Sequence, residues 1–256
     1  MSGSAPQVRR AGSFGAGRGE PYGRLLEAAI ATAVGDPSTP LRIALAEPVP
    51  DVVPARALVL RSVDGRHGPY HLDAGSWIRS ATPADLTALE GTTGPTLDVG
   101  CGPGRMVRAA AARSIPALGI DIAPHAVART RADGSLVLLR SVFERVPLEG
   151  HWQTVLLMDG NVGIGGDPES LLRRCRELLA PSGSVVVEVD PDPDLSVRAM
   201  CTVADDEGNE SEPFPWARVG WAAVVAVARR AGLETVAHWE AAGRHFVRSV
   251  PSGRPA

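Results

Sequence analysis

A glycine-rich loop is the part of this sequence whose residue types most clearly indicate chemistry. Gly100, Gly102 and Gly104 alternate with other residues directly after an apolar segment that reads as a strand. Glycines at this spacing let the backbone turn tightly and approach a bound molecule, and the helix predicted to follow points its N-terminus at that molecule. A dinucleotide-binding loop would place its third glycine where Arg105 stands. A tight turn without a ligand is the alternative interpretation.

Two carboxylates accompany the loop. Asp98 lies inside the strand just before it, where a negative charge would repel phosphates but would suit the ammonium group of an amino acid. Asp121 lies at the end of the next predicted strand, 117–122, where open α/β sheets bind their ligands. Capping of the following helix is the other interpretation of Asp121.

The sequence at 97–105, Leu-Asp-Val-Gly-Cys-Gly-Pro-Gly-Arg, closely resembles motif I of the class I S-adenosylmethionine (SAM)-dependent methyltransferases. The resemblance runs from about Pro95 to Val250. It implies that Asp98 and the glycines of the loop line the methionine part of SAM. It also implies that Asp121 binds the ribose and that Ile122 packs on the adenine.

The third motif of the family departs from the usual pattern. After the third strand the family places an acidic residue that contacts the adenine amine, whereas here Ser141 or the backbone at Val142 is expected to do so, with Glu144 as the alternative. The residues expected to bind the cofactor are Asp98, Gly100, Cys101, Gly102, Gly104, Asp121, Ile122, Ser141, Val142, Met158, Asp159 and Gly160.

A second unusual loop, Met-Asp-Gly-Asn-Val-Gly-Ile-Gly-Gly-Asp-Pro at 158–168, follows the fourth predicted strand. It resembles a subgroup of bacterial methyltransferases and lacks the Asn/Asp-Pro-Pro-aromatic motif of enzymes that methylate amino groups on bases. Open α/β sheets bind ligands at this end of their strands. Asp159 is therefore a candidate general base or acceptor-orienting residue, and Asn161 is a candidate acceptor contact. A turn capped by Asp159 is the equally weighted alternative.

The segment before the glycine loop is expected to cover the active site. Tyr70 and Trp77 are candidate substrate-binding residues in this segment. His71 is the histidine that could serve as a general base, and an exposed loop histidine is the alternative.

Two acidic loops contain residues that could act as metal ligands. Asp159, Asp190 and Asp192 could imitate the divalent-metal ligands of some O-methyltransferases. The Asp-Pro-Asp-Pro context at 190–193 does not match those enzymes, so no metal is predicted.

Strands and helices alternate from residue 95 onward, which predicts a doubly wound, seven-stranded and mostly parallel sheet of the Rossmann-like methyltransferase type. A terminal hairpin, 234–239 and 245–250, supplies one antiparallel strand. An amphipathic helix is expected over 217–231. The predicted organisation is a disordered tail, an N-terminal helical cap segment, a SAM-binding methyltransferase domain and a second tail, at 1–21, 22–94, 95–250 and 251–256.

Composition narrows the function further. The formal net charge of −3 offers no electrostatic footprint for nucleic acid or an anionic membrane. No apolar run could cross a bilayer and no signal peptide is apparent, so a cytoplasmic location is expected. Cys101, Cys175 and Cys201 are too few and too widely spaced for a disulfide framework.

Together these features predict an enzyme that uses SAM. It would move a methyl group by in-line displacement to an oxygen or nitrogen nucleophile of a small molecule, with secondary metabolism as the candidate setting. A SAM-binding sensor or subunit without methyl transfer is the alternative, and a nicotinamide-dependent Rossmann enzyme is less favoured. The acceptor, the methylated atom and the oligomeric state stay open.

Overall fold

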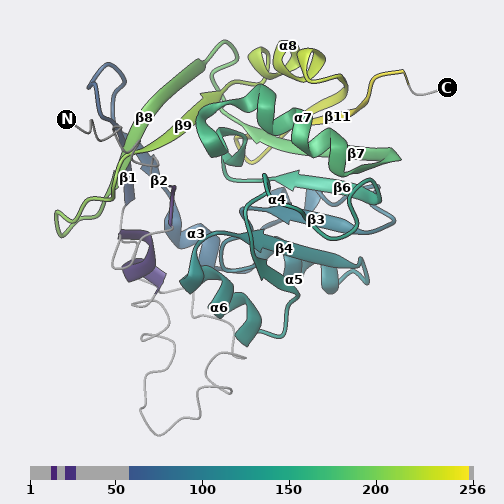
Figure 1. The fold of residues 1–256 in the computed structure, drawn as a ribbon, viewed down its shortest axis with the longest axis horizontal. Coiled ribbons are helices and arrows are strands. Elements are labelled where there is room, and N and C mark those ends of the chain that lie inside the picture. Colours follow the sequence, from purple (N-terminus) through teal and green to yellow (C-terminus); the bar gives the residue numbers. More distant parts are fainter. Residues whose placement is uncertain (1–12, 16–20, 27–57, 254–256) are drawn as a thin grey trace, which may run out of the picture.

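Two β-sheets organise the protein in the computed structural model, which describes residues 13–15, 21–26 and 58–253. The larger sheet carries helices on both faces, and the smaller sheet lies at one end beside the N-terminal segment (Figure 1). Expectations for the remaining residues, which include much of both predicted tails and part of the cap segment, lie outside the described residues.

The larger sheet has seven strands in the order β10-β11-β7-β6-β3-β4-β5. All neighbours pair in parallel except β11, which is antiparallel to both β7 and β10. This arrangement confirms the predicted doubly wound sheet with one reversed strand. Its strands are β3 (Thr96–Val99), β4 (Ala117–Asp121), β5 (Val137–Leu139), β6 (Trp152–Leu157), β7 (Leu179–Val189), β10 (Leu233–Ala241) and β11 (Arg244–Pro251).

Helices bury both faces of this sheet. On one face Val155 and Val185 pack in a core shared with α7 and α8, whereas the alternate residues Leu156 and Val186 face Met106 of α5. Burial on both faces explains why these strands read as continuous apolar runs. The helices are α3 (Ala74–Ile78), α4 (Pro83–Thr87), α5 (Arg105–Ala111), α6 (Pro124–Ala132), α7 (Pro168–Leu178) and α8 (Ala223–Arg230), with a 3₁₀ segment η1 (Asn161–Gly166).

The smaller sheet joins chain segments from before and after the glycine loop, in the order β2-β1-β8-β9. All of its pairs are antiparallel, and β1 pairs with β8, which lies far later in the sequence. Because β1 and β8 lie far apart in the sequence, no local sequence pattern predicts that they pair. The strands are β1 (Leu58–Ser62), β2 (Tyr70–Leu72), β8 (Ser196–Ala204) and β9 (Phe214–Val219).

One sequence-based prediction is wrong in part. The helix expected over 217–231 begins only at Ala223, because its first residues belong to β9. Ala217 and Val219 are buried two residues apart, as in a strand. Val224 and Val227 are buried three residues apart, as on one face of a helix. Because the prediction assigned part of β9 to the helix, it missed a strand that contributes side chains to the functional site.

Candidate active site

A large pocket opens at the carboxyl ends of β3, β4, β5 and β6, where the strand order reverses direction. It contains about 1010 Å³ of space between atoms, its open mouth included. That space is continuous with the solvent, and it is lined both by the glycine loop and by aromatic side chains from outside the loop.

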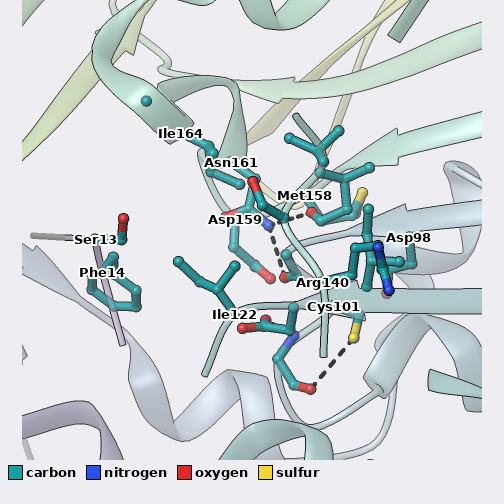
Figure 2. A pocket seen from close by; sticks show the side chains of 18 of the residues that line it. Ser13, Phe14, Asp98, Cys101, Ile122, Arg140, Met158, Asp159, Asn161 and Ile164 are labelled. Carbon is teal, nitrogen blue, oxygen red and sulfur yellow. Dashed lines mark hydrogen bonds between the residues drawn. The ribbon is translucent and has the colours of Figure 1, made fainter. Parts of the chain in front are cut away.

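The pocket brings together most of the residues predicted to bind the cofactor. Gly104 and Gly160 are the predicted positions that do not line it. Figure 2 shows the side chains of Asp98, Met158 and Asp159 on one side of the space and Phe14 on the other. The predicted residues that line the pocket are Asp98, Gly100, Cys101, Gly102, Asp121, Ile122, Ser141, Val142, Met158 and Asp159.

The glycine loop is held from the opposite side of the pocket by Asn161. The side-chain amide of Asn161 donates to the carbonyls of Val99 and Gly100, both at 2.9 Å. A Cβ on Gly100 would lie 2.7 Å from the Asn161 nitrogen, so this close approach requires glycine. Asn161, predicted as an acceptor contact, lines the pocket and also fixes the loop.

We expect Gly104→Ala to destabilise the protein more than Gly134→Ala. Both glycines have a positive φ, 84° and 78°, so both alanines are strained to a similar degree. A Cβ at Gly104 would meet the buried Thr130 at 2.6 Å, whereas Gly134 has nothing within 4 Å. The extra cost should be about 1–3 kcal/mol in urea unfolding. Equal costs for the two variants would contradict this packing argument.

Asp98 is a buried carboxylate without a hydrogen-bond partner among the residues that the structure describes. Its residue is 2% exposed and lines the pocket, and no other described residue forms a hydrogen bond with its side chain. Burial raises the pKa of Asp98 to about 7, against the opposing effect of Arg105. Such a group is stabilised by a cationic ligand, because an adjacent positive charge restores the ionised form.

Asp121 links β4 to the glycine loop. Its carboxylate accepts from the backbone N–H of Gly102 and from that of Ala123, both at 2.8 Å. Burial raises the pKa of Asp121, and these two N–H donors oppose the shift. Ala123 is the N-cap residue of α6, and α6 has no side-chain cap hydrogen bond, so the contact of Asp121 with Ala123 does not support the capping interpretation. Asp121 also lines the pocket, so the ribose role predicted for it stays open to test.

Asp159 is held in an ion network that the sequence did not reveal. Nη2 of Arg105 binds both Asp159 oxygens, at 2.8 and 2.7 Å, and lies 3.2 Å from Asp85. Arg244 binds Asp85 at 2.7 Å and Glu188 at 2.6 Å. Glu188 in turn accepts from the backbone N–H of Asp159 at 2.7 Å. Three carboxylates therefore share two guanidinium groups.

The charge balance of this network determines the state of Asp159. Burial raises the pKa of Asp159 and the neighbouring Glu188 adds to that shift, whereas Arg105 opposes it. Asp159 also has a positive φ of 54°, which is uncommon outside glycine and indicates a locally constrained backbone. With both oxygens bound by Arg105, Asp159 is oriented rigidly at the pocket wall.

Five aromatic rings form the wall that faces these carboxylates. Phe14 lies 5.2 Å from Tyr22, 6.1 Å from Trp77, 5.6 Å from Phe214 and 5.8 Å from Trp216, measured between ring centroids. All five rings line the pocket. We call this set the aromatic wall. Only Trp77 was predicted as a site residue, since the other rings come from the N-terminal segment and from β9.

Besides Gly104 and Gly160, two predicted site residues in the smaller sheet lie outside the pocket lining. Tyr70 and His71 belong to β2, an edge strand on which both residues are exposed. The Tyr70 ring lies under the guanidinium of Arg218, 3.8 Å from its carbon. Among the residues that line the pocket within the described ranges there is no histidine.

Neither a metal centre nor a membrane span is found in the part of the chain that the structure describes. Within those residues, no cluster of three or more His, Cys, Asp or Glu side chains is arranged to hold a metal ion. Within the same residues, no helix is both long and apolar enough to cross a membrane.

The chain is similar to known methyltransferases. A family described as methyltransferase domain matches residues 96–183. A SAM-dependent methyltransferase from Bacteroides fragilis, solved with S-adenosyl-L-homocysteine, superposes with a TM-score of 0.70 at 18% identity, over 94% of this chain and 98% of its own. The CcbJ methyltransferase from Streptomyces caelestis gives 0.52 at 16% identity, over 69% and 92% of the two chains. No curated protein sequence matches significantly.

Proposed function

We propose that this chain is a class I SAM-dependent methyltransferase and that it transfers the methyl group of SAM to an oxygen or nitrogen atom of a small molecule. The observation that carries the proposal is one pocket with two different halves. One half holds the glycine loop with Asp98 and Asp121, and the other half is the aromatic wall. A protein that only senses SAM has no need for the second half.

The residues of the first half fit the cofactor. Asp98 offers an unpartnered carboxylate to the ammonium group, and the glycine loop lets backbone atoms approach the methionine part. Asp121 accepts from the ribose hydroxyls, while Ile122 and Val142 pack against the adenine. Bound SAM supplies an electrophilic methyl group on a sulfonium.

The work of the protein is then mainly positioning. Asp159 is fixed by Arg105 beside the place where an acceptor would lie, so it orients the acceptor and adds negative charge near the reacting atoms. The aromatic wall excludes water from the same space. Holding two reactants in line can contribute about 7–11 kcal/mol to lowering a barrier, so no elaborate acid–base machinery is required.

A small acceptor of secondary metabolism suits this pocket better than a macromolecule. The aromatic wall is an apolar surface inside a single pocket, and the net charge of −3 gives no general attraction for nucleic acid. We also propose a cytoplasmic location. Cys101, Cys175 and Cys201 are all buried free thiols, which fits a reducing compartment.

Calorimetric titration tests the cofactor assignment. We expect micromolar binding of SAM and of S-adenosylhomocysteine and no comparable binding of NADH. Asp121→Ala should lower the affinity for both adenosyl ligands by about tenfold or more, because a charged hydrogen-bond acceptor is lost. The exposed Asp192→Ala is the matched control and should bind like the wild type. A preference for NADH, or equal binding by both variants, would refute the assignment.

A further inference from the structure

We infer that the aromatic wall is the acceptor subsite and that it takes a flat, apolar compound bearing an amine and no anionic group. The inference rests on the proposed function, whose acceptor it specifies. It is carried by the geometry of the wall, by its place in the chain and by the charges that face it.

The wall is built for a flat apolar group. Phe14 contacts four other rings, and Tyr22 and Trp77 meet edge to face at 5.6 Å, as Phe214 and Trp216 do at 6.0 Å. Phe214 and Tyr22 are nearly fully buried and anchor the set, while the partly exposed Trp77 and Trp216 extend the surface along the pocket. Packed rings of this kind keep their positions and present fixed π faces to a ligand.

The wall lies outside the methyltransferase domain match. That match covers residues 96–183, which contain every residue proposed above to bind the cofactor. The rings come instead from positions 14, 22, 77, 214 and 216. The residues proposed to bind the cofactor therefore lie inside the matched segment, and the five rings of the wall lie outside it.

The charges around the wall disfavour an anion. Asp98, Asp121 and Asp159 all line the pocket. The Arg105 guanidinium is occupied by Asp159, by Asp85 and by the carbonyl of Ser76. Arg140 lies across the pocket from Phe14 (Figure 2). Three carboxylates and two guanidinium groups thus line the pocket, so a phosphate or carboxylate on the acceptor would add to an excess of negative charge.

An amine on the acceptor, in contrast to an anionic group, is attracted by the charges of the pocket. Its ammonium form is attracted by the faces of Trp and Tyr rings and by the excess carboxylate of the ion network. The amine loses its proton to the solvent at the open mouth of the pocket, and its free electron pair then forms the new N–C bond. As that bond forms, the C–S bond to the methyl group breaks and its electron pair stays on the sulfur. Atoms and charge balance without a further reactant.

Three probes that share one ring system test the inference. Protein saturated with S-adenosylhomocysteine is titrated with naphthylethylamine, naphthylethanol and naphthylacetate, and binding is followed by saturation-transfer NMR. We expect the amine to bind about tenfold or more tightly than the acetate, with the alcohol between them. Equal or tighter binding of naphthylacetate would overturn the inference.

Variants locate the probe. Phe14→Leu and Trp216→Leu should each weaken naphthylethylamine binding about fivefold or more, because each removes one ring of the wall. Trp221→Leu is the matched control, since Trp221 stacks on His238 at 4.5 Å, away from the pocket lining, and should leave probe binding unchanged. Unchanged probe affinity in both wall variants would refute the acceptor subsite.

Measuring cofactor binding distinguishes a failure of the acceptor inference from a failure of the proposed function. Calorimetry with S-adenosylhomocysteine is run on every variant, and retained binding shows that the variant is folded. If the wild type binds S-adenosylhomocysteine but not naphthylethylamine, the acceptor inference fails alone. If it does not bind S-adenosylhomocysteine, the proposed function fails and the acceptor inference falls with it.

Discussion

Asp98→Asn should make the free protein more stable at pH 8 and at the same time weaken cofactor binding about 10- to 100-fold. The pKa of Asp98 is raised from 3.8 to about 7 in the folded protein, so the ionised form that predominates at pH 8 opposes folding. The neutral amide removes that penalty, and we expect a gain of about 2–4 kcal/mol in urea unfolding. The lost charge-assisted contact to the ammonium group weakens binding.

The pH dependence gives this prediction a second measurement. Because the folded pKa of Asp98 is raised, the wild type should gain stability as the pH falls from 8 towards 5, and Asp98→Asn should lack that gain. Cofactor affinity should move the other way, falling about tenfold per pH unit below 7 in the wild type only. A variant that binds like the wild type, or that is less stable at pH 8, would show that Asp98 has another role.

Removal of Arg105 should cause the largest loss of stability. Arg105 is 4% exposed and pairs with Asp159 and with the fully buried Asp85. Arg105→Met leaves three carboxylates with Arg244 alone, and breaking a buried pair in this way costs about 3–5 kcal/mol. Urea unfolding at pH 8 measures the cost, with the exposed Arg131→Met as the control.

The loss should be smaller at pH 5 than at pH 8. Without Arg105, the pKa of Asp159 is expected to rise further, because the group that opposes the burial effect is gone. An acid whose folded pKa is raised stabilises the folded state when it is protonated, so lowering the pH returns part of the lost stability. A cost below about 1 kcal/mol, or one that is equal at both pH values, would mean that the network contributes little to folding.

The parts of this molecule that were predicted from the sequence are those with local signals. The glycine loop, Asp98 and the strands around them follow each other closely, and each strand of the parallel sheet is a short apolar run. The start of α4 also depends on a local feature, because Thr82 forms a capping box with Asp85 three residues later. Such features depend on neighbours a few residues away, so their pattern can be read directly.

The ion network and the aromatic wall had no such signal. Asp85, Glu188 and Arg244 come from α4, β7 and β11, and only the packed sheet brings them together. In the sequence, Arg105 stands at the position where a dinucleotide-binding loop has its third glycine, and nothing nearby identifies it as a partner of Asp159. In the same way, Phe214 and Trp216 belong to a strand whose residues were partly assigned to a helix, so their side of the pocket was not expected.

The split origin of the smaller sheet has a consequence for engineering. Its strands β1 and β2 precede the glycine loop, whereas β8 and β9 are inserted between β7 and α8. In this protein β1 pairs with β8, with Val59 opposite Ala204. A chimera that exchanges only the N-terminal segment with a relative would pair β8 with a strand from the other protein. Transplanting acceptor preference therefore requires moving both pieces as one unit, and trimming the chain to its cofactor-binding part would uncover an unpaired edge.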